Sequence, residues 1–169
     1  MVTNQATRRT RRLAIVLATA TVLAAGASLP TAYATGGEDN NGRGKQSRLD
    51  ASLTGAKERP GPGDDDGRGK ARLQLKKDKI CFELSWRKIG APTAAHVHRG
   101  QLEEAGPVVV GLLSVPAPGL GAPVSSIGGC VVPEDPALIA DIRSHPGAYY
   151  VNIHNVAFPA GAIRGQLHR

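Results

Sequence analysis

The chain has 169 residues, with 21 Lys and Arg against 14 Asp and Glu and a formal net charge of +7. This length allows one or two domains. Only 4% of the residues are aromatic. No basic patch is interleaved with aromatic residues, so the sequence does not support nucleic-acid binding.

The first 34 residues have the three parts of a secretory signal peptide. Four arginines between residues 8 and 12 form a basic region, residues 13–27 are apolar, and residues 32–34 (Ala-Tyr-Ala) supply a cleavage site. An apolar stretch of this length is short for a membrane-spanning helix, although a single anchor is the alternative. We therefore expect a secreted mature chain without a transmembrane span. The excess of basic over acidic residues is smaller in the mature chain than in the full chain, because the leader carries four arginines and no acidic residue.

The next segment, residues 35–47, is polar and rich in Gly and Asn, which predicts a disordered tail. From residue 48 the pattern alternates between apolar and polar residues, as in β-strands. We expect seven strands, with the sequences RLDASLTG, KARLQLKK, KICFELSWRKI, PTAAHVHRG, PVVVGLLSV, GAYYVNIHN and AIRGQLHR. The fifth is continuously apolar, which predicts a strand buried on both faces or placed at a sheet junction.

One short helix is predicted near residues 135–144. Asp135 can cap it, Pro136 suits its first position, and Pro146 follows its end. Many short strands, Gly/Pro-rich turns and a single helix together predict an all-β domain over residues 48–169, built as an antiparallel β-sandwich. A domain of this size can bury one core.

Two cysteines, Cys81 and Cys130, occur in the chain. Export makes a disulfide between them possible, and only one intramolecular pairing exists. Two buried free thiols are the alternative. A metal site on the two sulfurs is disfavoured, because neither lies in a C-x-x-C pair.

The motif AHVHRG followed by GPVVV, together with the later YYVNIHNVAFPAGAIRGQL, resembles the chordin-type (CHRD) domain of single-domain secreted bacterial proteins. The resemblance runs from about Leu49 to Leu167 and includes an opening strand with L-x-G-x-x-E before a Pro/Gly/Asp turn. Cys81 and Cys130 fall where many bacterial members carry a cysteine pair. The resemblance implies a β-sandwich of immunoglobulin-like or Cu,Zn superoxide-dismutase-like type. It implies no known activity.

Side-chain alternation divides each late strand into an apolar and a polar face. We expect the apolar faces to pack in the core and the polar faces to point outward. If the strands are neighbours, one outer surface collects the polar residues His96, His98, Tyr150, Asn152, His154, Arg164 and Gln166. This cluster is the candidate site.

Two interpretations of the cluster remain open. An H-x-H pair on one strand face with a third imidazole suits copper or zinc, which makes His96, His98 and His154 candidate metal ligands. Copper sites of the superoxide-dismutase type also use such a pair, but no stretch matches the zinc-binding loop of that enzyme. A shared ion would require the three imidazole nitrogens to lie within about 4–5 Å of one another.

The other interpretation is structural. In this case His98 and His154 bond the backbone, and Arg164 pairs with one of three acids, which are Glu83, Glu103 and Glu104. The expected function is then a binding or structural module, without assigned catalytic residues, whose partner is an extracellular protein or a cell-surface component. The sequence does not identify that partner, a required cofactor or an oligomeric state.

Overall fold

The computed structural model describes residues 47–169. The predicted signal peptide and the predicted tail up to residue 46 lie outside the described residues, whereas Ser47, which was expected to end the tail, is the first residue of β1. The strands are β1 (Ser47–Thr54), β2 (Arg68–Leu75), β3 (Ile80–Arg87), β4 (Pro92–Arg99), β5 (Val108–Ser114), β6 (Ser126–Val131), β7 (Tyr149–Asn155) and β8 (Ile163–Gln166). The helices are α1 (Ala137–Ser144) and two short 3-10 turns, η1 (Gly55–Lys57) and η2 (Pro146–Ala148). No helix in this range is long and apolar enough to span a membrane.

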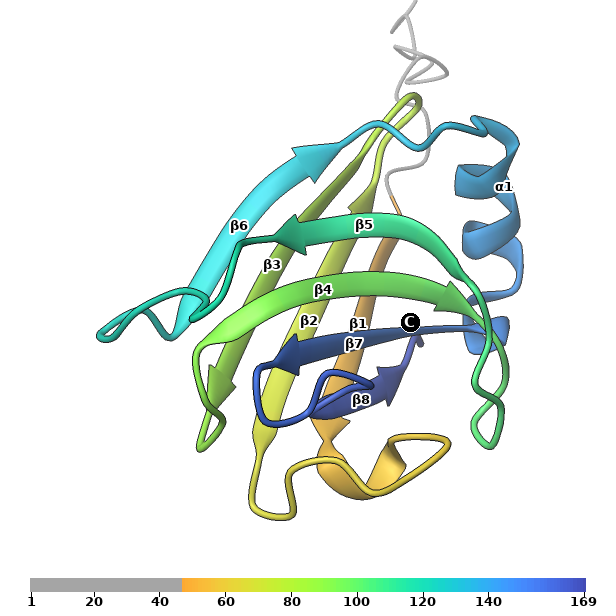
Figure 1. Ribbon diagram of the computed structural model, residues 1–169. Helices are drawn as coiled ribbons and strands as arrows, with labels where there is room; N and C mark the ends of the chain where they lie inside the picture. Colours follow the sequence, from red (N-terminus) through yellow and green to blue (C-terminus); the bar gives the residue numbers. More distant parts are fainter. Residues whose placement is uncertain (1–46) are drawn as a thin grey trace, which may run out of the picture. The chain divides into compact units, whose positions relative to one another are not determined.

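The eight strands form one sheet in the order β5-β4-β7-β8-β1-β2-β3-β6, and every neighbouring pair is antiparallel. Figure 1 shows how the sheet folds over itself, so that β4, β5 and β7 form a layer across β1, β2 and β3. The predicted fold class, an antiparallel all-β sandwich, is confirmed in a nearly closed form. Its two edge strands are β5 and β6.

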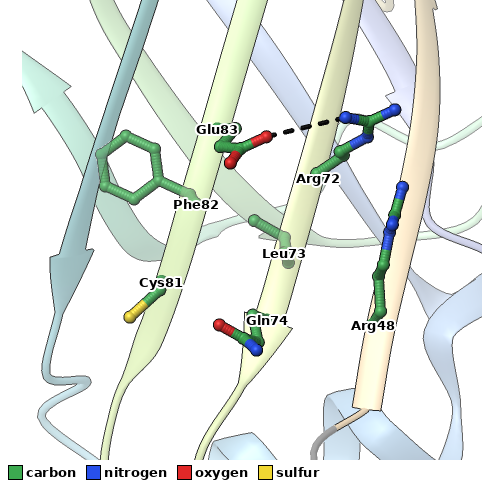
Figure 2. Close-up of a pocket in the computed structure, with 7 residues that line it drawn as sticks. All are labelled: Arg48, Arg72, Leu73, Gln74, Cys81, Phe82 and Glu83. Atoms are coloured by element: carbon green, nitrogen blue, oxygen red, sulfur yellow. Dashed lines mark ion pairs between the residues drawn. The ribbon is translucent and has the colours of Figure 1, made fainter.

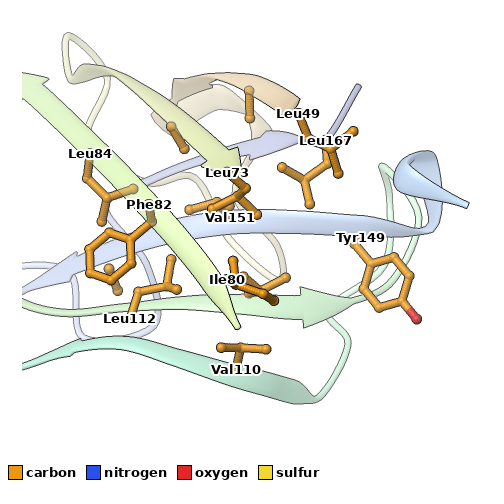
Figure 3. Packing of buried hydrophobic residues seen from close by; sticks show 14 of the residues in the cluster. Leu49, Leu73, Ile80, Phe82, Leu84, Val110, Leu112, Tyr149, Val151 and Leu167 are labelled. Atoms are coloured by element: carbon orange, nitrogen blue, oxygen red, sulfur yellow. The ribbon is translucent and has the colours of Figure 1, made fainter. Parts of the chain in front are cut away.

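The core lies between the two layers and takes the apolar residues of each alternating strand. Leu49, Leu73 and Leu84 on one layer and Val97 and Val151 on the other are all at most 1% exposed. Figure 3 shows these layers meeting through side chains of β1, β2, β3, β5 and β7. Burial of each such Leu or Val side chain stabilises the fold by roughly 1.5–3 kcal/mol. This packing fixes which face of β4 and β7 carries the polar cluster.

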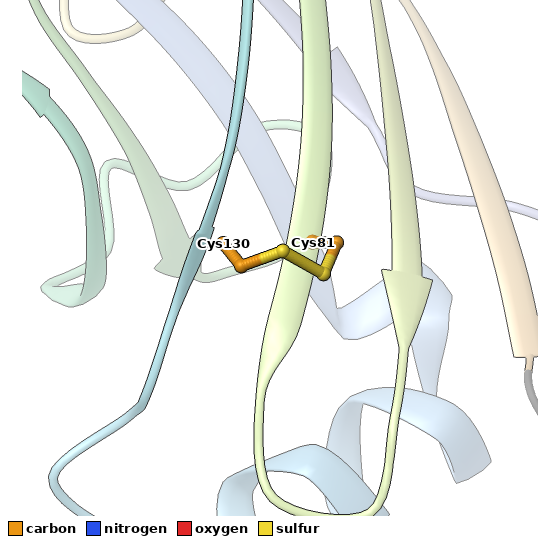
Figure 4. The surroundings of a disulfide bond; sticks show 2 residues. All are labelled: Cys81 and Cys130. Carbon is orange, nitrogen blue, oxygen red and sulfur yellow. A yellow bond between two sulfur atoms is a disulfide. The ribbon is translucent and has the colours of Figure 1, made fainter.

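The strand β6 was missed by the sequence analysis, because Gly128 and Gly129 interrupt its apolar alternation. It is held to β3 by a ladder in which Cys81 lies directly opposite Cys130. The two residues form the expected disulfide, as Figure 4 shows. The bond fastens an edge strand to the sheet across a sequence separation of 49 residues.

The predicted helix is present as α1, but it begins at Ala137, and Pro136 rather than Asp135 occupies the N-cap position. Asp135 Oδ1 still accepts a hydrogen bond from the backbone N–H of Ala137 at 2.8 Å. Its buried residues, Leu138, Ile139 and Ile142, join the core. The helix ends at Ser144, and its C-cap residue, His145, stands immediately before the proline that begins η2.

The expectation that β5 is buried on both faces is wrong. The strand is a sheet edge, and only Val110 and Leu112 are buried, while Val108 is 50% exposed. Its continuous run of apolar residues concealed the alternation that the structure contains. The sequence therefore overstated how deeply this strand is enclosed.

Candidate metal centre on β4 and β7

The polar residues of the candidate site are brought together by three neighbouring strands, β4, β7 and β8. His96 lies opposite Asn152, and His98 lies opposite Tyr150, in the β4–β7 ladder. In the next ladder Asn152 is opposite Arg164, and Tyr150 is opposite Gln166. Antiparallel partners share a face of the sheet, so the cluster occupies the face opposite the core, as the alternation predicted.

The expectation that this surface is open to solvent is wrong. Tyr150, Asn152 and Arg164 are at most 3% exposed, and His98 is 8% exposed. The cover is the loop between β4 and β5, which we call the Gly100–Pro107 loop. Sequence alternation identifies a face, but it does not reveal that a loop folds over that face.

Several side chains of the cluster bind the backbone of this loop. Arg164 donates hydrogen bonds to the carbonyl oxygens of Gln101 and Glu104, both at 2.6 Å. Gln166 donates to the carbonyl of Gly100 at 2.7 Å. Tyr150 Oη accepts a hydrogen bond from the N–H of Gly106 at 3.2 Å. The loop is therefore held by the strands beneath it.

The expected pairing of Arg164 with a carboxylate of Glu83, Glu103 or Glu104 is wrong. Its guanidinium binds backbone carbonyls, and Cζ lies 3.4 Å from the ring centroid of Tyr150. Glu103 instead accepts a hydrogen bond from Arg59 Nε at 2.9 Å. A planar guanidinium can stack its face on an aromatic ring while the N–H groups at the edge of the guanidinium donate hydrogen bonds.

The three candidate imidazoles converge. Ligand nitrogens of His96, His98 and His154 all lie within 4.8 Å of one another. His96 Nδ1 is 3.1 Å from His154 Nε2, and the two ring centroids are 4.9 Å apart. This spacing meets the geometric requirement for a shared ion. Within the described range, no second group of three such ligands occurs.

Backbone carbonyls orient two of the rings. His98 Nδ1 is 2.8 Å from the carbonyl oxygen of Gly106, and His154 Nδ1 is 3.0 Å from that of Pro159. A carbonyl only accepts, so each Nδ1 carries the proton, and Nε2 of the neutral ring holds a lone pair. Metal-ligating histidines commonly donate their second ring N–H to such an acceptor. The same contacts also satisfy the structural interpretation, which expected backbone bonds at these residues.

The third ring and Asn152 complete the network. Because His154 Nε2 is an acceptor, His96 Nδ1 donates its proton to it. His98 Nε2 lies 3.0 Å from Asn152 Oδ1, and because an amide oxygen only accepts, a lone pair on Nε2 requires the Asn152 amide to turn so that its NH2 faces the ring. Metal binding at His98 Nε2 would replace this hydrogen bond.

The local environment keeps the three histidines neutral. Burial lowers the pKa of His96 to about 4, with further lowering from the charges of His154 and His98. Burial also lowers the pKa of His98, against the opposing hydrogen bonds to Gly106 and Asn152. The pKa of His154 is lowered by burial and then by His98. Neutral imidazole is the form that binds a metal ion, so no proton has to be removed from a charged ring near pH 7.

One buried ionisable residue beside this network, Glu58, was not predicted from the sequence. It is 2% exposed, and burial raises its pKa to about 7 even though the charge of Arg164 lowers it. A Cβ on Gly161 would lie 2.5 Å from the carboxyl group of Glu58, so a glycine is needed there. The L-x-G-x-x-E opening, which ends at Glu58, was the signal that could have identified it.

The two remaining histidines stay outside the cluster. His145 is exposed, and its Nδ1 lies 2.8 Å from Asp141. His168 is exposed near the C-terminus and has a backbone bridge to Asp50 of β1. Neither belongs to the group of three.

These features define a disulfide-linked antiparallel β domain with a covered polar cluster on one sheet face. The family model of the CHRD domain matches residues 49–167, so the chain belongs to the CHRD domain family. The expected family is therefore confirmed, and it suggests a binding or structural module. No curated protein and no solved structure matches the chain.

Proposed function

We propose that this CHRD-domain protein is a secreted binding module that holds one copper or zinc ion on His96, His98 and His154. The observation that carries the proposal is the convergence of the three imidazoles within 4.8 Å. Their neutral state and the carbonyl acceptors at His98 and His154 support it further. Imidazole nitrogen suits both metals, so the donor set alone does not choose between them.

Export of the chain is part of the same proposal. Its support is the signal-like N-terminal sequence and the Cys81–Cys130 disulfide, since disulfides persist in oxidising compartments. The role proposed for the histidines is metal binding rather than catalysis, and we assign no catalytic residue. The partner proposed for the module remains an extracellular protein or a cell-surface component.

Calorimetric titration of the purified, disulfide-bonded protein with Zn²⁺ and with Cu²⁺ tests the proposal. We expect one ion per chain and at least a tenfold loss of affinity in His98→Gln, because a ligand nitrogen is removed. His145→Gln is the matched control, since it makes the same substitution at an exposed histidine outside the cluster. Equal affinities of the two variants would reject the proposed ligands, and no binding by the unaltered protein would reject the function.

A further inference from the structure

A groove runs along the outer face of β1, β2 and β3, away from the histidine cluster. It consists of three adjoining cavities with volumes of about 310, 440 and 560 Å³. The first two share Arg72 and Glu83, and the last two share Lys70, Ser85 and Ser126. The shared residues make the groove continuous along β2 and β3.

The ladder registers show which side chains line this groove. One row across the sheet contains Ser52, Lys70, Ser85 and Ser126, from β1, β2, β3 and β6 in turn. The next row places Arg68 directly opposite Arg87 on β2 and β3. Like charges directly opposite each other destabilise a sheet unless something compensates them.

The three cations at one end of the groove form no ion pair with an acid of residues 47–169. Among residues 47–169, the side chains of Lys70 and Arg87 make no hydrogen bond or ion pair. The Arg68 side chain hydrogen-bonds only the carbonyl oxygens of Asp65 and Gly67, although its charge also acts on Asp66. The nearby acid Asp66 is paired with Lys88. We call this end, formed by Arg68, Lys70 and Arg87, the cationic end.

The opposite end already carries balanced charge. Asp50 is 3.3 Å from both Arg48 and Arg72, and Glu83 is 3.7 Å from Arg72. Figure 2 shows Arg72 reaching from β2 toward Glu83 on β3, with Arg48 on the neighbouring strand β1. The face as a whole therefore has a cationic excess that is concentrated at the cationic end.

We propose that this groove binds an anionic polysaccharide, with the charged groups of the polymer at Arg68, Lys70 and Arg87. The serine hydroxyls of the adjoining row can exchange hydrogen bonds with sugar hydroxyls. A groove that spans several strands suits an extended chain. Single-stranded nucleic acid is disfavoured, because its binding sites stack bases on exposed aromatic rings, whereas Trp86, the aromatic residue that lines the cavity at the cationic end, is 7% exposed.

The test measures binding of the disulfide-bonded protein to dextran sulfate, with neutral dextran as the uncharged comparison. We expect Lys70→Gln/Arg87→Gln to weaken binding about tenfold, from the loss of two exposed charge contacts. The slope of log affinity against log salt concentration should also fall by about one for each removed cation. The matched control is Lys77→Gln/Lys79→Gln, which removes the same charge at the β2–β3 turn.

Three results would overturn the proposal. The first is equal weakening by both double variants, which would mean attraction by net charge alone. The second is no binding of dextran sulfate by the unaltered protein in low salt. The third is tighter binding of a single-stranded oligothymidylate of equal charge than of dextran sulfate. Thermal unfolding of each variant verifies that a loss of binding does not reflect a loss of folding.

Discussion

Substitution of Glu58 by Gln provides a test of the buried charge beside the cluster. The carboxyl group has an ordinary pKa of 4.5, and burial raises it to about 7 in the folded protein. A pKa difference of this size corresponds to about 3 kcal/mol between the protonated and ionised forms. Gln keeps the shape of the side chain and removes its titration.

The sign of the pH dependence of stability follows from the direction of the pKa shift of Glu58. Because the folded-state pKa is the higher one, the folded protein holds this proton more tightly than the unfolded chain does. The stabilisation from Glu58 is therefore complete below pH 4.5 and is lost as the pH rises through about 7. Relative to the unaltered protein, Glu58→Gln should gain about 3 kcal/mol in its free energy of unfolding between pH 4 and pH 8.

Urea denaturation of both proteins at intervals from pH 4 to pH 8 measures this gain. The difference between the two proteins removes the histidine contribution, which acts in the opposite direction because those pKa values are lowered. A difference that stays constant across this range would refute the reasoning. It would mean that Glu58 ionises as readily in the folded protein as in the unfolded chain.

Three further predictions concern stability and the covering loop. Cys81→Ser/Cys130→Ser should lower the free energy of unfolding by up to about 4 kcal/mol in denaturant titrations, and an unchanged midpoint would contradict this. Gly161→Ala should cost about 2 kcal/mol by the same assay, because its φ of +142° disfavours a side chain and the new Cβ would meet the buried carboxyl group. Arg164→Met should cost about 3 kcal/mol and speed amide hydrogen exchange in residues 101–106 more than in β2, since it removes two charged hydrogen bonds to that loop. Equal acceleration of amide hydrogen exchange in the loop and in β2 would contradict the conclusion that Arg164 specifically fixes the loop.

The parts of the fold that the sequence predicted are those governed by local alternation. The sheet face assigned to His96 and His98 was correct. Ala95, which precedes them, and Val97, which lies between them, are buried in the core, so the two histidines must point to the other face. The helix was found because Asp135, which accepts a hydrogen bond from its first backbone N–H, and the terminating Pro146 flank it. Strand β6 was missed, since glycines lack the apolar side chains on which the pattern depends.

The parts that could not be predicted depend on contacts between distant segments. Burial of Arg164 results from a loop some 60 residues earlier in the chain, whose carbonyl groups carry no signal in the sequence. The raised pKa of Glu58 likewise arises from enclosure by the segment around Gly161. The convergence of His154 with His96 required only that β4 and β7 be neighbours, which was assumed at the sequence level and is observed.

The most direct test of the central claim is X-ray absorption spectroscopy of the zinc-loaded protein. The account predicts three imidazole nitrogens at about 2.0–2.1 Å from the metal, and two in the His98→Gln variant. An unchanged imidazole count in that variant, or a coordination shell made only of oxygen atoms, would contradict the assignment of the ion to His96, His98 and His154.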